Sequence, residues 1–305
     1  MKKMTVTIGI PAYNEANNIA ALLSELTHQK TKRVRIGRIN VISDGSVDAT
    51  VSQARKVKDH KVQVVGYKKT AGPAIRQDQL IGMTHTDILV LLNADIAISD
   101  PYFVEKLVTP IVRKQAQMTS AAIAELPPRT FFESVLGVSM QLKEILFSEF
   151  KRGNNLYNCH GAARAFHKDL YQKLHFKMNE GEDMYSYMAC IKNKLKFVYA
   201  PRAIMYYRLP ATFVDHNKQS LRYLHAQNVL GLQTDSASAK AELTIPTPII
   251  LRAGIKSVRI IMSRPLHVLV YLGVLLVIKL RALARFYPNQ TWNVVSSKII
   301  REAKV

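Results

Sequence analysis

The segment Val6-Thr7-Ile8-Gly9-Ile10-Pro11-Ala12-Tyr13-Asn14-Glu15 decides the fold, because an apolar run passes directly into a polar turn that carries a carboxylate. The run is typical of a buried strand, and the same arrangement recurs twice. Asp44 follows the apolar residues 39–42, and Asp95 follows the apolar residues 88–92. Residues just past the ends of parallel strands converge on one crevice, so we expect three carboxylates at one edge of a sheet.

Apolar runs alternate with helix-like stretches through the first third of the chain. We expect strands near residues 4–11, 36–43, 62–66, 87–93 and 118–124. We expect helices near residues 15–29, 47–58, 72–84 and 100–115. This alternation predicts an α/β fold, in which βαβ units form a mostly parallel sheet flanked by helices.

The middle of the chain is less regular. Pro127-Pro128 breaks it, after which the sequence predicts a helix over 131–150 and a polar loop over 153–165. A further helix is expected near 181–193, with apolar runs at 195–200 and 203–207.

Charge is the unusual feature of the composition. Over 305 residues, 43 Lys and Arg against 22 Asp and Glu give a formal net charge of +21. Such an excess suggests nucleic acid, an anionic membrane surface or phosphorylated substrates as partners. Cys159 and Cys190 have no metal-ligand or redox spacing, which indicates a reducing compartment. Residues 4–10 are too short for a signal core, so we expect a cytoplasmic protein.

The C-terminal segment has a different character. Residues 249–305 hold ten basic residues and one acid, Glu302. Arg252, Lys256 and Arg259 share one helical face, which predicts a helix that lies in a membrane interface. The uncharged run 265–278 spans roughly 21 Å, short of the ~30 Å hydrocarbon core. We therefore predict a monotopic or re-entrant anchor rather than a full span, with a buried core helix as the alternative.

The order and spacing of the motifs resemble glycosyltransferase family 2, whose members have the GT-A (Rossmann-like) fold and invert the anomeric centre. The resemblance covers roughly residues 4–210, and its motifs are more specific as a set than singly. It rests on residues 11–19, 44–50, 72–76, 93–95, 161–164 and 181–183.

The resemblance implies a donor site. By it, Pro11, Tyr13 and Glu15 border the base and ribose, Asp44 accepts a hydrogen bond from the base, and Arg76 lies near the phosphates. The alternative for Asp44-Gly45-Ser46 is a simple turn, and Ser46 or Asp48 could cap the next helix.

The resemblance also implies a divalent metal, Mn²⁺ or Mg²⁺, held by Asp95 as the last acid of an Asp-x-Asp signature. Oxygen ligands suit these ions, which are usually held by one or two carboxylates plus substrate phosphates. Asn93 replaces the first acid of the signature; it can bind a ribose but brings no charge, so we expect Asp95 to be the only signature acid on the metal.

On the acceptor side, the resemblance implies Asp183 as the general base with Glu182 beside it, and Arg164 at the acceptor. Asp183 could instead be a helix-terminal acid, and Arg164 an ordinary surface cation. Residues 219–223 resemble the Gln-x-x-Arg-Trp element of membrane-bound synthases, with Tyr in place of Trp. There Arg222 would assist the diphosphate and Tyr223 would stack on the acceptor sugar; the alternative is a basic amphipathic helix.

Together these features predict three consecutive parts. Residues 1–125 would bind the nucleotide sugar, 126–210 would bind the acceptor and supply the base, and 211–305 would associate with the membrane. The expected activity is metal-dependent transfer from a nucleoside-diphosphate sugar, with UDP as the favoured nucleotide, to a lipid-linked or glycan acceptor in cell-envelope polysaccharide synthesis. A polyprenyl-phosphate sugar transferase and a non-catalytic nucleotide-binding scaffold are the alternatives. Nucleic acid is disfavoured as a partner, since no nucleic-acid fingerprint is present.

Overall fold

The structure is a computed structural model that describes residues 3–176, 181–233, 236–284 and 300. The fold divides into two compact units. The described residues of Met1–Ala124, Cys159–Arg208 and Lys298–Val305 form unit 1, and those of Glu125–Asn158 and Leu209–Ser297 form unit 2. This partition differs from the three consecutive parts expected from the sequence, because the segment 126–210 is shared between the two units.

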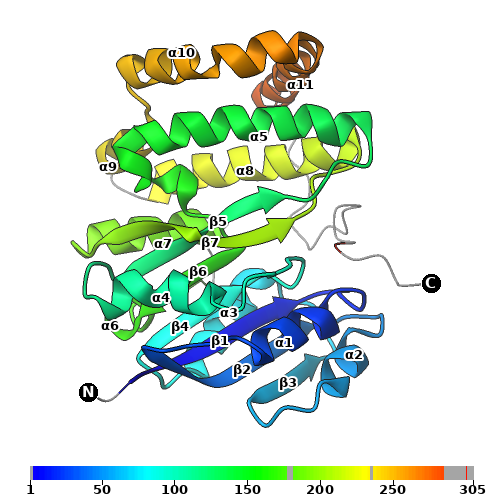
Figure 1. The fold of residues 1–305 in the computed structure, drawn as a ribbon, viewed down its shortest axis with the longest axis vertical. Helices are drawn as coiled ribbons and strands as arrows, with labels where there is room; N and C mark the ends of the chain where they lie inside the picture. The colour runs from blue at the N-terminus through cyan, green and yellow to red at the C-terminus, as the bar shows by residue number, and fades with distance from the viewer. Residues whose placement is uncertain (1–2, 177–180, 234–235, 285–299, 301–305) are drawn as a thin grey trace. The chain divides into compact units, whose positions relative to one another are not determined.

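Unit 1 is built on a mixed sheet that is parallel over most of its width (Figure 1). The described strands are β1 (Met4–Ala12), β2 (Val34–Asp44), β3 (Val62–Tyr67), β4 (Ile88–Leu92), β5 (Met118–Glu125), β6 (Ala163–His167) and β7 (Phe197–Tyr207). Their order is β3-β2-β1-β4-β6-β5-β7. β1 pairs in parallel with both β2 and β4, and β2 with β3, whereas β6 runs antiparallel to β4 and β5. The predicted α/β sheet is confirmed.

The helices of unit 1 flank this sheet, and the first four alternate with the strands as the sequence predicts. They are α1 (Ile19–Thr27), α2 (Thr50–Lys56), α3 (Pro73–Gly82), α4 (Phe103–Val112), α6 (Lys168–Tyr171) and α7 (Glu182–Lys192). Each of the first four begins later than expected, because the residues before it form structured turns at the sheet edge. Val6, Ile8 and Ile10 of β1 are fully buried, together with Leu22 and Leu23 of α1.

Two parts of the sheet differ from the sequence prediction. β6 lies where a loop was expected, because Arg164 interrupts an otherwise apolar run and hides the strand pattern. β7 is one continuous strand, although Pro201-Arg202 separates its two apolar runs. A proline is tolerated there because β7 is at the end of the strand order, where one side of the backbone needs no ladder partner.

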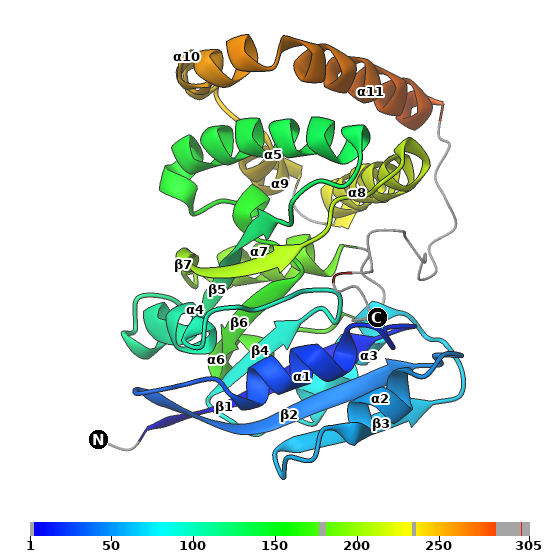
Figure 2. The same ribbon diagram turned by 45° about the vertical axis from the view of Figure 1, so that its right-hand side comes forward.

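Unit 2 is helical in its described residues (Figure 2). Its helices are α5 (Phe131–Glu149), α8 (Phe213–Gln233), α9 (Ser236–Leu243), α10 (Thr247–Ser263) and α11 (Pro265–Leu283), with short 3₁₀ turns at Phe150–Gly153 and Leu156–Asn158. α5 starts at a capping box, in which the Thr130 hydroxyl accepts from the Glu133 amide and the Glu133 carboxylate accepts from the Thr130 amide.

One helix of the described residues, α11, is long and apolar enough to cross a membrane, and 17% of its most apolar stretch is buried. It continues past the uncharged run 265–278 and takes in Lys279 and Arg281. Its 19 residues correspond to ~28 Å, longer than the uncharged run alone, so the length and composition of α11 permit a span as well as a flat orientation. Arg285, Lys298, Arg301, Glu302 and Lys304 lie outside the described residues.

Candidate active site

The ends of β1, β2 and β4 meet at one edge of the sheet. Ala12 of β1 is in register with Ser43 of β2, and Gly9 of β1 is in register with Leu91 of β4. The polar residues that follow each strand, at positions 13–15, 44 and 93–95, therefore line up along this carboxyl edge. The structure thus brings together the predicted nucleotide and metal residues.

The turns after β1 and β2 are joined by side-chain hydrogen bonds. Asn14 has a left-handed backbone (φ 54°), a conformation that Asn tolerates better than most residues. Four bonds link the turns: Asn14 N to Ser46 Oγ (3.0 Å), Val47 N to Asn14 Oδ1 (3.0 Å), Glu15 N to Thr50 Oγ1 (2.7 Å) and Ala16 N to Asp48 Oδ2 (3.1 Å). Ser46 and Asp48 thus hold the first turn in place, a role that sequence reasoning did not assign to them.

The first turn is rigid at its base and accessible at Tyr13. Glu15 is buried; its carboxylate accepts from Asn18 Nδ2 (2.8 Å), and its carbonyl accepts from the amides of Asn18 and Ile19. Pro11 is buried and Tyr13 is half-buried. Glu15 therefore stabilises the turn that precedes α1. Of Pro11, Tyr13 and Glu15, Tyr13 has the side chain most accessible to a ligand.

Asp44 is the most heavily engaged acid at this edge. Its side chain is 0% exposed and accepts from the amides of Ala71 and Gly72 (2.8 Å each) and from Arg76 Nε (2.5 Å). Asp44 therefore holds the turn before α3 in place. The hydrogen bonds that do so compete with the predicted hydrogen bond from Asp44 to a base.

Arg76 also differs from expectation. It is 3% exposed, and besides Asp44 it donates to Lys69 O (2.8 Å) and Gln79 Oε1 (2.9 Å). Its guanidinium carbon lies 3.8 Å from the centroid of the Tyr67 ring. Because protein acceptors and an aromatic face surround it, the structure does not present Arg76 as an open phosphate ligand.

Asp95 differs from Asp44 and Arg76 in that the described residues do not bond to its side chain. Asn93 N donates to Ala162 O (2.9 Å) and so continues the β4–β6 ladder, while Ala94 and Ile96 are buried. Asn93 and Asp95 alternate with them and are half-buried. Among the residues that the structure describes, none forms a hydrogen bond or ion pair with the Asp95 carboxylate. An unengaged carboxylate at a strand end is available to an incoming ligand.

The described residues fit a metal that arrives with its substrate. They contain no group of three or more His, Cys, Asp or Glu able to hold an ion. Mg²⁺ and Mn²⁺ need fewer protein ligands, because substrate phosphates and water fill most of their coordination sphere. Asp95 could supply the protein oxygen, and Asn93 beside it adds no second charge.

Asp183 lies in the first turn of α7. Its Oδ1 accepts from the Met184 amide (2.9 Å), and Gly181 precedes the helix with φ 78°. A Cβ on Gly161 would lie 3.4 Å from Asp183 Oδ2, so a glycine there lets the loop before β6 approach the carboxylate closely. Glu182 is the first residue of the same helix, and both acids are half-buried. The position suits a base and also a helix-terminal acid.

Arg164 is interior, contrary to the surface position considered from sequence. It is 1% exposed, and its Nη1 donates to Glu182 O and Ser186 Oγ (2.8 Å each). Its Nη2 donates to Gln77 Oε1 (3.0 Å), so one guanidinium joins α3 to the first turn of α7. These bonds connect Arg164 to the helix that carries Asp183, and its assignment to the acceptor stays a prediction.

Arg222 and Tyr223 are on α8 of unit 2. Both side chains are exposed, whereas Leu221 between Ser220 and Arg222 is buried against Val274 and Ile278 of α11. Their assignment to the diphosphate and the acceptor stays a prediction.

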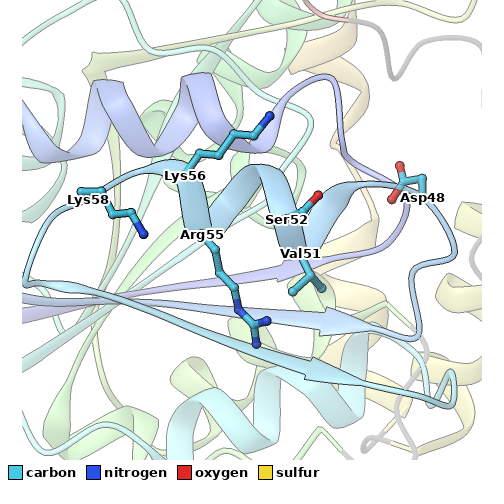
Figure 3. A pocket seen from close by; sticks show the side chains of 6 residues that line it. All are labelled: Asp48, Val51, Ser52, Arg55, Lys56 and Lys58. Carbon is cyan, nitrogen blue, oxygen red and sulfur yellow. The ribbon is translucent and has the colours of Figure 1, made fainter.

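A separate depression of about 640 Å³ lies over α2, lined by Asp48, Val51, Ser52, Arg55, Lys56 and Lys58 (Figure 3). Of its three exposed cations, Arg55 and Lys56 are on α2 and Lys58 follows the end of that helix. Its acid, Asp48, is already bonded to Thr50 and Ala16. This depression adjoins the carboxyl edge of the sheet only at Asp48, and Asp48 is its one acid.

The family assignment follows from the sequence profile and the fold. The profile of the family described as Glycosyl transferase family 2 matches residues 7–175, more than half of the chain. The chain therefore belongs to glycosyl transferase family 2 and is a glycosyltransferase with a GT-A-like fold. No curated protein sequence matches it.

Solved structures share the fold at low sequence identity. A Pyrobaculum calidifontis mannosyltransferase in complex with GDP-Man and Mn²⁺ is 16% identical with a TM-score of 0.59, covering 93% of this chain and 79% of that one. Glucosyl-3-phosphoglycerate synthase from Mycobacterium tuberculosis with Mn²⁺, UDP and phosphoglyceric acid is 16% identical (TM-score 0.53, covering 73% and 78%). Residues 1–349 of S. aureus TarS are 14% identical (TM-score 0.53, covering 84% and 73%).

Removing the Asp44 carboxylate should destabilise unit 1. Asp44→Ala leaves the buried Arg76 guanidinium without its counter-ion, which typically costs 3–5 kcal/mol, so we expect a loss of about that size in urea unfolding. Asp169→Ala, at an acid whose side chain is 58% exposed, should change stability by less than about 0.5 kcal/mol. Equal losses in the two variants would contradict the anchoring role of Asp44.

His160 should make stability depend on pH. Burial lowers the pKa of His160 to about 4, from 6.5. The unfolded chain then binds more protons between pH 6.5 and 4, so the contribution of His160 is complete above pH 6.5 and declines as pH falls toward 4. In urea unfolding, His160→Gln should flatten this decline by up to about 1.4 kcal/mol per pH unit. His60→Gln, at a side chain that is 87% exposed, should leave the slope unchanged.

Proposed function

We propose that the protein is a metal-dependent inverting glycosyltransferase. It moves a sugar from a nucleoside-diphosphate sugar to a lipid-linked or membrane-proximal glycan at the cytoplasmic face of the membrane. The observation that carries the proposal is the Asp95 carboxylate just after β4, which no described residue engages, on the edge where β1 and β2 also end. In open α/β sheets this edge is where ligands bind.

The donor and metal assignments draw support from the shared fold. The Pyrobaculum mannosyltransferase was solved with GDP-Man and Mn²⁺, and the mycobacterial synthase with Mn²⁺ and UDP. We assign the base and ribose to Pro11, Tyr13, Glu15 and Asn93, and favour UDP as the nucleotide. The formal charge of +21 favours an anionic donor of this kind.

The residues divide the chemistry between them. When bound at Asp95, Mn²⁺ or Mg²⁺ would neutralise the charge that develops on the leaving diphosphate. Asp183 would take the proton of the acceptor hydroxyl as its oxygen forms the new bond to the anomeric carbon and the bond to the diphosphate breaks. Arg164 would keep the first turn of α7, and with it Asp183, in place through Glu182 O and Ser186. Attack opposite the leaving group inverts the anomeric centre.

A polyprenyl-phosphate acceptor is the second candidate. The exposed apolar surface of α10 and α11 suits a lipid acceptor of either kind. A phosphate oxygen is already anionic, so such a transfer would need no base. A non-catalytic scaffold is disfavoured, because both the metal acid and the candidate base are present.

Loss of the Asp95 carboxylate should abolish most turnover. We expect Asp95→Ala and Asp95→Asn to lower Mn²⁺-dependent release of nucleoside diphosphate by about 100-fold or more, because no second signature acid replaces it. The assay is a donor panel of UDP- and GDP-sugars with Mn²⁺ and Mg²⁺, read by mass spectrometry. Asp59→Asn, away from the carboxyl edge of the sheet, is the matched control. Near-normal turnover by Asp95→Ala would reject the metal assignment.

Asp183 should separate the two acceptor chemistries. With a hydroxyl acceptor, Asp183→Asn should lower kcat by about 10²- to 10⁴-fold and leave donor affinity unchanged, because only the proton acceptor is lost. With a polyprenyl phosphate, the same variant should keep most of its activity. Parallel assays with both acceptors, and with Asp169→Asn as control, decide between them.

A further inference from the structure

One face of α10 is apolar and exposed although the opposite face is packed. Ala253 and Ser257 are buried in the contact of α10 with α5. On the far side, four large apolar side chains are between 52% and 74% exposed: Leu251, Ile255, Val258 and Met262. At 100° per residue these four share a narrow stripe of the helix.

α11 likewise has one packed face and one exposed apolar face. Its packed face holds Tyr271, Val274 and Ile278. Six leucines on the other face are between 56% and 80% exposed: Leu266, Leu269, Leu272, Leu276, Leu280 and Leu283. Both helices pack on α5 and form one layer over it, as Figures 1 and 2 show from two directions. We name these ten exposed side chains the α10–α11 face.

α11 is packed along its length against α5 and α8 of its own unit. His267 lies 3.1 Å from Ser134 Oγ of α5, and Lys143 of α5 stands over the Tyr271 ring at 5.4 Å. Further along, Val274 and Ile278 pack on Leu221 of α8. A helix that crossed a bilayer in this packing would draw Lys143 and the rest of α5 into hydrocarbon, where charged side chains are costly. The packing therefore favours a helix that lies along the surface.

The charges beside this face have one sign. Arg252 and Arg259 lie along one side of the apolar stripe of α10, Arg264 lies at the junction of the helices, and Lys279 lies near the end of α11; all four are exposed. Arg281 stands over the Phe213 ring of α8 at 5.8 Å, on the packed side of α11. Lys256 is paired with Glu149 of α5. The sequence has no acid between Leu243 and Ala284. A second copy of the chain would bring cations against cations, whereas anionic headgroups would complement them.

We propose that the α10–α11 face is a monotopic membrane-binding surface, which lies flat in the interface of an anionic bilayer and does not span it. The leucines would enter the boundary between headgroups and acyl chains, with Arg252, Arg259, Arg264 and Lys279 at headgroup level. The inference rests on the proposed function only in that a membrane location brings the enzyme to its acceptor. Donor turnover does not depend on it.

Vesicle co-sedimentation of the full chain tests the surface. We expect at least about 10-fold tighter binding to phosphatidylcholine vesicles with 30% phosphatidylglycerol than to phosphatidylcholine alone. The triple variant L269N/L272N/L276N should weaken binding by at least about 100-fold, and R252Q/R259Q by about 20-fold on anionic vesicles only.

Matched controls carry the same changes on unit 1. I191N/I204N replaces two exposed apolar side chains, and R55Q/K58Q removes two exposed cations; both should bind vesicles like the unaltered chain. Equal binding to both vesicle types, or equal losses in the control variants, overturns the proposal. So does a lipid-free dimer that L269N/L272N/L276N dissociates, since the face would then be a protein interface.

Depth measurement separates a flat helix from a span. Leu269, Leu276 and Leu283 are seven residues apart on one side of α11, and the native Cys159 and Cys190 are buried, so single cysteines at these three positions can be spin-labelled selectively. A flat helix places the three labels at similar depth, whereas a span separates the outer two by roughly 21 Å. A graded depth would overturn the monotopic assignment. Nucleoside-diphosphate release measured on the same variants should be unchanged, so failure of the surface and failure of the transferase proposal are distinguishable.

Discussion

The parallel pairing of β1 with both β2 and β4 is the constraint on which the candidate site depends. Because all three strands run in the same direction, their carboxyl ends lie at one edge of the sheet. The register of Ala12 with Ser43 and of Gly9 with Leu91 sets how close the strand ends are to one another. The polar turns that follow these strands therefore lie at the same edge. Their bonds to one another, such as Asn14 to Ser46, make the edge a rigid platform for a ligand.

The acids at this edge differ in how many protein groups bond to their carboxylates. Asp44 is surrounded by N–H donors and the Arg76 guanidinium, so its charge serves the fold. Asp95 follows a strand whose ladder is completed by backbone groups, and no described residue forms a hydrogen bond or ion pair with its carboxylate. Arg164 is likewise engaged by the protein: this buried cation bonds to Glu182 O and Ser186 at the start of α7.

Unit 2 uses apolar surface in two ways. On α11, Val274 and Ile278 bury against Leu221, while leucines on the opposite face stay exposed. Exposed apolar patches of this extent mark interaction surfaces, because leaving them in water is unfavourable. The basic residues beside them select among partners by charge, so composition and packing point to the same kind of surface.

The sequence by itself determined the alternation of strands and helices, the family motifs, and the positions of Asp95 and Asp183, because these depend on local periodicity and on neighbours in the chain. Only the tertiary structure determined which groups bond to each charged side chain. Asp44 finds its partners 27 to 32 residues away, at Ala71, Gly72 and Arg76, and Arg164 finds one 87 residues away, at Gln77. β6 escaped sequence reasoning for the same reason: its buried arginine is tolerated only because groups from distant helices satisfy it. Whether α11 spans or lies flat is likewise a matter of packing, since its length and composition permit both.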